Sequence, residues 1–551
     1  MNGITAKDIL AILIPLFGGL GLFLYGMNVM SDGIEKSAGN KMEKIIEKLS
    51  GNIFKGVLVG AIVTVIVQSS SATTVMVVGF VNAGIMNLTQ AIGIIMGANI
   101  GTTITAQLVS INLTALAPVA IAIGSAIKLF SKKNKQVIVG EIVLGFGMLF
   151  LGMDIMKQAM SPLKEFAGFT EMVSAIGSGT ILGTVEGFVL GFVITTLVQS
   201  SSASTGILVA LALTGALPIQ AAFPVLLGTN VGTCTTALIS SISANRTAKR
   251  AALMHLLFNV IGTIVFIIFF SKLTVNLVVS MSDEPARQLA NAHTFFNVVN
   301  TLLLLPFAGL IVKAVTKLLP VTEEEKEEQM FGTKYLDERI LETPTIAMGQ
   351  VIKEVLHMGN LAKLSLESAV ESVETNNIKA AEKTFKIEKT INMLEREISN
   401  YLIKLSNTSI DFEDRQIIDG LFSTINDIER VGDHADNIAE LGMYKVDNEV
   451  IFSEKAVAEM KEMVDQVSKA FDMAMDSLRE GDRHKAQRVV EIEGAIDEME
   501  KTLRKKHISR LNEGRCETNS GIVFLDMLSN LERISDHASN IALAVLDVRG
   551  E

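Results

Sequence analysis

The hydrophobic pattern of the 551-residue sequence changes near residue 320. Before that point, long apolar segments recur with short polar stretches between them, and about 20 apolar residues suffice to cross a bilayer. These segments lie at roughly 9–30, 56–83, 89–109, 113–130, 137–159, 185–213, 218–241, 250–270 and 292–312. After it, heptad-like stretches such as Ala369–Leu405 and Val457–Ile508 predict long helices without strand-like alternation. We therefore expect an all-α chain with a polytopic membrane part and a soluble part.

Two of the apolar segments are interrupted by the same polar run. Gln68–Ser71 divides the segment 56–83, and Gln199–Ser202 divides the segment 185–213, with an offset of 131 residues between the two runs. Apolar segments broken in this way are typical of hairpins that enter and leave the membrane on one side. We therefore predict two re-entrant hairpins, each with the sequence Gln-Ser-Ser-Ser (QSSS) at its turn.

The QSSS runs belong to a larger internal repeat. Gly97–Thr102 recurs as Gly228–Thr233 at the same offset of 131 residues, with the common pattern G-x-N-x-G-T. A weaker match, with a shifted register, relates Leu24–Asn28 to Leu151–Asp154. The repeats span about 9–130 and 137–270. If both hairpins are re-entrant, three crossings separate the repeats, and this odd number makes the repeats inverted; full spanning by both hairpins would change the parity.

The charges divide the chain at the same place as the hydropathy. Met1–Pro320 holds 19 Lys and Arg against 12 Asp and Glu, a net charge of +7. The remainder carries a net charge of −18, and the two parts sum to the total of −11. Basic residues in the cytoplasmic loops are the usual signature of membrane orientation. Here the loops assigned to the cytoplasm hold Lys36, Lys41, Lys44, Lys48, Lys55, Lys128, Lys132, Lys133, Lys135, Arg246, Lys249, Arg250, Lys313 and Lys317. This places the N-terminus outside and the acidic C-terminal part in the cytoplasm.

The hairpins offer oxygen ligands and hydroxyl donors but no basic side chain. Glutamine supplies an amide carbonyl, and serine hydroxyls both donate and accept hydrogen bonds. Neither 56–83 nor 185–213 contains Lys or Arg. An anion bound there would need backbone N–H groups at helix N-termini, hydroxyls and a co-bound cation. The pattern thus favours an ion site in which a cation such as sodium supplies the missing positive charge.

The paired QSSS and G-x-N-x-G-T motifs resemble the bacterial members of the type II sodium-dependent phosphate cotransporter family. This resemblance implies phosphate symport with sodium by alternating access, around a central site where the hairpins meet. Cys234 departs from the pattern, since it occupies the place that matches Thr103. The residues expected to bind phosphate and sodium are Gln68, Ser69, Ser70, Ser71, Gln199, Ser200, Ser201 and Ser202, with Asn99, Thr102, Asn230 and Thr233 as second choices.

The C-terminal part is also duplicated. Ile428–Ala439 returns as Leu531–Ala542, and two three-helix bundles are the simplest architecture. In each copy Glu and Asp sit at i and i+4 on one helical face, which is suited either to a metal cluster or to a solvated face paired with arginine. His434 and His537 point away from that stripe and are expected to be hydrogen-bonded helix residues.

The segment 343–548 resembles a PhoU domain, a six-helix regulator of phosphate uptake whose ExxxD motifs bind metal. This resemblance implies a divalent or iron ion as cofactor. Asn392 departs from the acidic pattern in the first bundle. The residues that match the motif are Glu429, Asp433, Glu493, Asp497, Glu532 and Asp536.

The expected organisation is a transmembrane domain over 1–320, an acidic linker over 321–342 and a PhoU-like domain over 343–551. Expected partners are inorganic phosphate, sodium and the lipid bilayer of the cytoplasmic (inner) membrane; a homodimer stays open, and no nucleic acid is expected. Alternatives are a symporter or exporter of another oxyanion, and a membrane phosphate sensor. An intramembrane hydrolase is disfavoured because His255 and His293 fall far from the serines and in different spans.

Overall fold

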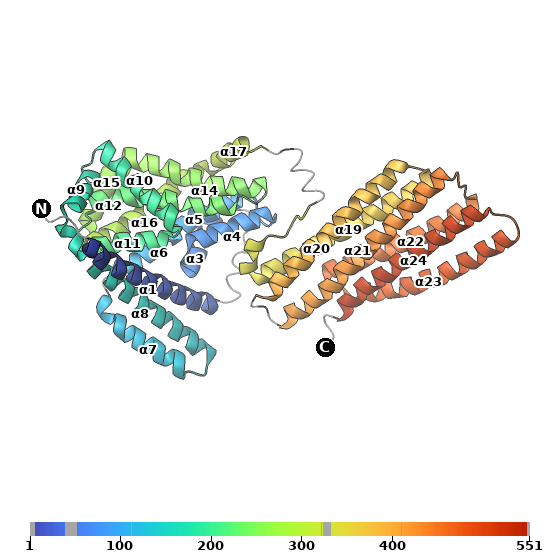
Figure 1. The fold of residues 1–551 in the computed structure, drawn as a ribbon, viewed down its shortest axis with the longest axis horizontal. Helices are drawn as coiled ribbons and strands as arrows, with labels where there is room; N and C mark the ends of the chain where they lie inside the picture. The colour runs from blue at the N-terminus through green and yellow to red at the C-terminus, as the bar shows by residue number, and fades with distance from the viewer. Residues whose placement is uncertain are drawn as a thin grey trace. The chain divides into compact units, whose positions relative to one another are not determined.

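The computed structural model describes residues 6–38, 52–111, 113–320, 322, 332–408, 410 and 412–547. Every regular element in these ranges is a helix, which confirms the all-α prediction (Figure 1). The chain divides into two compact units, Met1–Val321 and Thr322–Glu551. Lys41, Lys44 and Lys48, and most of the acidic linker, lie outside the described residues.

The N-terminal unit contains two matching sets of helices and a C-terminal group. The first set comprises α1 (Ala6–Ala38), α3 (Ile53–Val67), α4 (Ser70–Asn82), α5 (Leu88–Gly101), α6 (Thr103–Val109), η1 (Thr114–Leu116) and α7 (Ala117–Phe130). The second set comprises α8 (Asn134–Met160), η2 (Ser161–Glu165), α9 (Ala167–Ile176), α10 (Ile181–Val198), α11 (Ser201–Thr214), α12 (Ile219–Gly232) and α13 (Cys234–Ser240). The last group comprises α14 (Arg246–Val265), η3 (Phe266–Phe270), α15 (Ser271–Met281), α16 (Pro285–Leu304), η4 (Leu305–Phe307) and α17 (Ala308–Leu318).

Seven helices among the described residues are long and apolar enough to cross a membrane. Two of these, Arg246–Met281 and Pro285–Leu318, are longer than the segments 250–270 and 292–312 expected from hydropathy. The first continues because a π-helical turn over Phe266–Phe270 joins α14 to α15. The helices α3, α4, α7 and α11 are shorter, and α3 with its 15 residues extends only about 22 Å.

In each set, the first arm of the interrupted segment packs closely along the helix that follows the hairpin: α3 packs on α5, and α10 packs on α12. A β-carbon on Gly97 would lie 2.0 Å from the carbonyl oxygen of Val57, and one on Gly228 would lie 2.0 Å from that of Phe188. The two contacts are related by the same offset of 131 residues. Glycine is therefore needed at both positions, because the helix backbones touch there.

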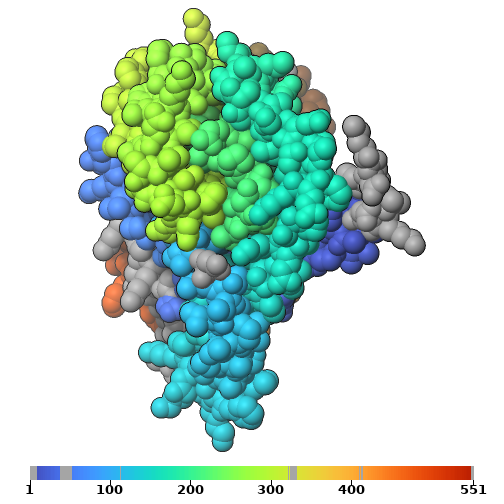
Figure 2. Space-filling view, turned by 90° about the vertical axis from the view of Figure 1, so that its left-hand side faces the viewer, coloured from blue at the N-terminus to red at the C-terminus, as the bar shows by residue number. Residues whose placement is uncertain are grey.

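The helices α1, α8 and α7 pack side by side in that order. The helix α1 packs along α8, so the weakly matching segments Leu24–Asn28 and Leu151–Asp154 lie on neighbouring helices. On its other side α8 pairs with α7, whose apolar side chains are largely exposed, Phe130 to 84%. Figure 2 shows this α7–α8 hairpin (cyan) as a narrow lobe beside the rest of the N-terminal unit. Exposed apolar helices of this kind suit a lipid environment.

The C-terminal unit consists of six long helices after a short η5 (Glu338–Glu342). The helices are α19 (Pro344–Thr375), α20 (Ile378–Ser406), α21 (Phe412–Asp447), α22 (Glu454–Glu480), α23 (Arg483–Asn512) and α24 (Thr518–Asp547). The first three pack on one another, the last three do the same, and α21 packs on α24 between the two groups. The predicted pair of three-helix bundles is therefore confirmed.

Candidate functional site

Each QSSS run forms a helix break of the same geometry. Gln68 ends α3 in the left-handed region at φ 55°, and Gln199 ends α10 at φ 53°. The next serine then starts a new helix: the hydroxyl of Ser69 accepts the backbone N–H of Ala72 at 3.1 Å. Its counterpart Ser200 caps α11 in the same way. Each break thus brings the carbonyl end of one helix next to the N–H end of another, and such ends bind cations and anions respectively.

The glutamine of the first break is held by a neighbouring helix. Gln68 is buried, with 7% of its side chain exposed, and its Oε1 accepts the hydroxyl of Thr105 on α6 at 2.9 Å. Its amide nitrogen donates to the carbonyl of Val65. Both ends of this amide are therefore occupied.

The glutamine of the second break is free of that contact. Gln199 is exposed, and Thr236, the residue equivalent to Thr105, has a buried hydroxyl without a hydrogen-bond partner. The two breaks have the same backbone but different side-chain environments. Thr105 and Thr236 were missed from the sequence, although they share the 131-residue offset.

The burial of the serines also differs between the two breaks, and the most buried serine is not at equivalent positions. The Ser70 side chain is 1% exposed and its hydroxyl has no partner, whereas Ser69 and Ser71 are half-buried. In the second break Ser202 is 7% exposed, and Ser200 and Ser201 are half-buried. The unpartnered Ser70 hydroxyl remains available to a ligand.

The G-x-N-x-G-T blocks end α5 and α12. Asn99 is 2% exposed and its amide nitrogen has no partner, whereas the Oδ1 of Asn230 accepts Asn297 at 3.4 Å. Thr102 and Thr233 lie at the junctions to α6 and α13 and are buried. The thiol of Cys234, in place of a threonine, accepts the amide of Asn259 at 3.3 Å.

The structure joins the repeats through the second arms of the hairpins. The helix α4 of the first set packs on α13 of the second, and α11 of the second set packs on α6 of the first. Within the described residues, no hydrogen bond runs from one QSSS run to the other.

The second bundle of the C-terminal unit contains a carboxylate cluster. One ligand oxygen each from Glu493, Asp497 and Asp536 lies within 4.8 Å of the others. Burial raises the pKa of Glu493, and the charges of Asp497 and Asp536 raise it further. The pKa of Glu532 is raised in the same way, first by burial and then by Asp536. Three crowded carboxylate oxygens fit a hard divalent or iron cation, which would relieve the repulsion between them.

The first bundle lacks such a group among its described residues. Glu429 and Asp433 share a helix face, but Asn392 takes the place of the aspartate and its amide donates to Glu388. Arg430 pairs with Asp433 at 3.3 Å, as Arg533 does with Asp536. The first bundle therefore has an amide where the second has a carboxylate.

Two histidines form a reciprocal pair between the bundles. His434 Nδ1 lies 2.9 Å from Oδ1 of Asn530, and His537 Nδ1 lies 2.9 Å from Oδ1 of Asp427. The rings stack with their centroids 5.6 Å apart. The prediction that both are hydrogen-bonded helix residues is confirmed.

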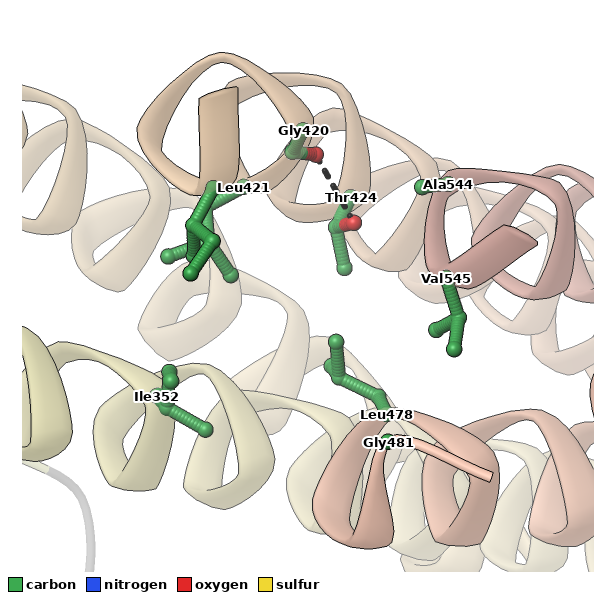
Figure 3. A pocket seen from close by; sticks show the side chains of 9 residues that line it. Ile352, Gly420, Leu421, Thr424, Leu478, Gly481, Ala544 and Val545 are labelled. Carbon is green, nitrogen blue, oxygen red and sulfur yellow. Dashed lines mark hydrogen bonds between the residues drawn. The ribbon is translucent and has the colours of Figure 1, made fainter. Parts of the chain in front are cut away.

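An apolar cavity of about 130 Å³ lies between α19, α21, α22 and α24 (Figure 3). Its lining includes Ile352, Leu421, Leu478 and Val545. The hydroxyl of Thr424 at its wall donates to the carbonyl of Gly420 at 2.9 Å. This lining offers no charged group to phosphate or a metal ion.

Comparisons with known proteins match both halves of the chain. Residues 22–158 and 164–294 match the family model described as Na+/Pi-cotransporter, and residues 355–442 and 460–545 match the PhoU domain. The "Putative inorganic phosphate export protein YjbB" of Salmonella typhimurium is 24% identical over 538 residues, 97% of each chain. The "Uncharacterized protein YqeW" of Bacillus subtilis is 30% identical over 313 residues, 56% of this chain and 99% of its own length.

The C-terminal unit has relatives of its own. The "Phosphate-specific transport system accessory protein PhoU homolog 1" of Thermotoga maritima is 32% identical over 195 residues, 35% of this chain and 83% of that protein. The crystal structure of PhoU from Pseudomonas aeruginosa has 25% sequence identity and a TM-score of 0.35, and the match covers 36% of this chain and 95% of that one.

Proposed function

Because the chain belongs to the Na+/Pi-cotransporter family and carries PhoU domains, we propose that it is a sodium-coupled phosphate symporter of the cytoplasmic membrane. The observation that carries this proposal is the pair of serine-capped helix breaks at Gln68 and Gln199. Each break offers backbone N–H groups to an oxyanion and carbonyl groups to a cation within an apolar unit. Phosphate would bind at the N-terminal ends of α4 and α11.

Sodium coupling follows from the missing positive charge. Neither hairpin contains a lysine or arginine near its break. A phosphate ion moved into this environment without counter-charge would be strongly disfavoured. Co-bound sodium supplies that charge, so the two ions bind and cross together. The ligands would come from both QSSS runs, with Asn99, Thr102, Asn230 and Thr233 as a second group.

Alternating access is supported by the unequal glutamines. Gln68 is buried and bonded to Thr105, whereas Gln199 is exposed and Thr236 is unpaired. We propose that this conformation is closed at the first hairpin and open at the second. In the opposite state Gln199 would bond to Thr236 and Gln68 would be released.

The proposed domains are a transmembrane part over 1–320, a linker over 321–342 and a cytoplasmic regulatory part over 343–551. The regulatory part would bind a divalent or iron ion through Glu493, Asp497, Glu532 and Asp536, with Glu429 and Asp433 as a weaker set, and would throttle transport. Import follows from an inward sodium gradient. Export is the second candidate, because a relative aligned over 97% of both chains is named for phosphate export.

The test is radiolabelled phosphate flux in proteoliposomes with sodium gradients of either direction. The wild-type chain should accumulate phosphate along the imposed sodium gradient. A Gln68→Ala, Gln199→Ala double variant should lose at least about 90% of this flux. The first change removes the buried amide of Gln68, and the second removes the exposed amide of Gln199 at the other break. Gln136→Ala, at an exposed glutamine outside the motifs, is the matched control.

Each other outcome has a defined meaning. Phosphate flux that ignores sodium would keep the substrate and overturn the coupling. Flux only after removal of residues 332–551 would assign an inhibitory role to the C-terminal unit. Absence of flux from both chains would favour another oxyanion or a phosphate sensor.

A further inference from the structure

A second, shorter repeat lies in the membrane part after the QSSS repeats. His255–Thr263 on α14 and His293–Thr301 on α16 share the pattern H-x2-F-N-V-x2-T with an offset of 38 residues. The side chains of Asn259 and Asn297 are both 0% exposed. Polar residues that repeat at membrane depth and stay buried are usually functional.

The packing shows that these two helices are equivalent partners in the inverted repeat. The helix α14 packs on α4, α5 and α13, and α16 packs on their counterparts α11, α12 and α6. The two helices meet at equivalent positions, because a β-carbon on Gly262 would lie 2.1 Å from Oδ1 of Asn300. The pseudo-symmetry that relates the hairpins therefore also relates α14 to α16.

Both asparagine amides are oriented by the backbone of their own helix. Asn259 Nδ2 donates to the carbonyl of His255 at 3.1 Å, and Asn297 Nδ2 donates to the carbonyl of His293 at 2.9 Å. A carbonyl oxygen only accepts, so the nitrogen of each amide must face it. The Oδ1 atoms of Asn259 and Asn297 then point elsewhere, and neither has a partner.

A hydroxyl joins this set one turn further along α14. Thr263, four residues after Asn259, is 3% exposed, and its Oγ1 also has no partner. Each buried polar group left unpaired costs about 1–3 kcal/mol. Three such oxygens in two equivalent segments would be a large cost for packing alone, and a bound cation would remove that cost for each oxygen it contacts.

The chemistry of these atoms selects a cation. Carbonyl and hydroxyl oxygens are ligands of hard cations. Neither His255–Thr263 nor His293–Thr301 contains Asp, Glu, Lys or Arg, so the ionisable side chains of these segments are His255 and His293. A neutral oxygen set suits a monovalent ion better than a divalent one, since a divalent ion would leave more charge uncompensated in the apolar interior.

We propose that Asn259, Thr263 and Asn297 are ligands of a co-transported sodium ion at a site separate from, and additional to, the QSSS breaks. Asn297 already contacts Asn230 of the G-x-N-x-G-T block, and Asn259 contacts Cys234 next to it. The ligands on α14 and α16 are thereby linked to the hairpin repeats. This inference rests on the proposed function, because it assigns the coupling ion of that transport.

The test uses Thr263→Val in the full chain. This change removes a hydroxyl that makes no hydrogen bond and keeps the shape of the side chain, so a purely structural role predicts unchanged or higher stability. The matched control is Thr274→Val on the same continuous helix, where the buried hydroxyl donates to the carbonyl of Phe270 at 2.8 Å. Asn259→Ala and Asn297→Ala extend the test, and Thr263→Ser restores the hydroxyl.

The measurement is the thermal unfolding midpoint of the purified protein as sodium chloride replaces choline chloride at constant ionic strength, without phosphate. A ligand that binds the folded state raises this midpoint in a saturable way. We expect the half-saturating sodium concentration to rise about tenfold or more in Thr263→Val, Asn259→Ala and Asn297→Ala, which corresponds to about 1.4 kcal/mol. Thr274→Val and Thr263→Ser should behave as wild type.

Equal sodium responses in Thr263→Val and wild type, or no sodium response in wild type, would overturn the assignment. The flux assay separates this failure from that of the proposed function. Sodium-driven phosphate flux with the same sodium dependence in Thr263→Val would reject the ligands and keep the transporter. Absence of phosphate flux from the wild-type chain would reject the transporter itself.

Discussion

At the residue scale, His507 shows how burial fixes a protonation state in the C-terminal unit. Its side chain is 1% exposed and its ring stacks on Phe524 with centroids 4.3 Å apart. Burial lowers the pKa of the imidazole, and the nearby Arg510 cation lowers it further. The folded protein therefore favours neutral His507 more strongly than the unfolded chain does.

This shift predicts a pH-dependent stability with a definite sign. Because the folded pKa lies below the ordinary value, the contribution of His507 is complete above about pH 6.5 and is lost as the pH falls below it. Between pH 7 and pH 5 the unfolding free energy of the wild-type protein should fall by on the order of 1 kcal/mol through His507. In His507→Leu this part of the fall should be absent. Denaturant unfolding followed by circular dichroism at both pH values measures it.

His484→Leu is the control, since His484 is an exposed histidine on the same helix. That variant should keep the wild-type pH dependence. An unchanged pH dependence in His507→Leu would show that the imidazole is not the group that titrates.

The residues predicted from sequence were those whose role is local. Gln68 and Ser69 form a helix stop followed by a helix start, and both signals are carried by neighbouring residues in the chain. Thr105 was missed because its contact with Gln68 depends on how α6 packs. Asn259 and Asn297 were missed for the same reason: spacing does not show which oxygen remains unpaired. The ligand roles of the QSSS residues stay a prediction.

At the element scale, the close packing of α3 on α5 and of α10 on α12 depends on glycine. Gly97→Ala and Gly228→Ala each place a methyl group 2.0 Å from a backbone carbonyl, so the paired helices must separate. Each change should destabilise the N-terminal unit by about 1–3 kcal/mol, the usual cost of overpacking. The thermal unfolding midpoint of the detergent-solubilised protein and the phosphate flux would both fall.

Gly18→Ala on α1 is the comparison for these variants, because no atom lies within 4 Å of a β-carbon built there. It should leave both measurements near the wild-type values. If Gly97→Ala matched Gly18→Ala, the contact between α3 and α5 would not be as close as the structure has it.

The helical type and the positions of the long apolar segments followed from hydropathy, but the number, limits and partners of the helices did not. The segment 250–270 was too short because hydropathy falls over Ser271–Met281, while the helix continues there through a π turn. The break between α5 and α6 was also invisible, since Gly101–Thr103 lies within an apolar run. Packing of α14 beside α4 and α5 could not be inferred from a helix so distant in the chain.

At the scale of the whole molecule, the chain divides into two compact units near the position where its charge changes sign. The apolar, weakly basic part and the acidic part correspond to separate compact units, and each unit contains its own internal repeat. Repeats gave the most reliable information, because matched blocks at one offset must occupy matched places in a symmetric fold. What the repeats could not reveal is where the two copies differ, as Gln68 and Gln199 do in exposure.

The two bundles of the C-terminal unit differ at one position that should decide metal binding. The cluster of Glu493, Asp497 and Asp536 has its counterpart in Glu388, Asn392 and Asp433, where an amide replaces a carboxylate. An amide adds no charge to the set and binds a divalent ion more weakly. The first bundle should therefore bind such an ion less tightly than the second.

Exchanging these residues tests this difference in both directions. In the full chain stripped of metal, Asp497→Asn should weaken manganese binding at least about tenfold. Losses of about this size are usual when a residue that hydrogen-bonds to a metal ligand is replaced. Asn392→Asp should add a second bound ion, because it completes the carboxylates of the first bundle. Calorimetric titration with manganese gives both affinity and stoichiometry, and Asp476→Asn, which alters a carboxylate paired with Arg479, is the control. An unchanged affinity in Asp497→Asn would mean that the acidic stripe is a solvated face. An unchanged stoichiometry in Asn392→Asp would mean that one carboxylate does not account for the difference in metal binding between the bundles.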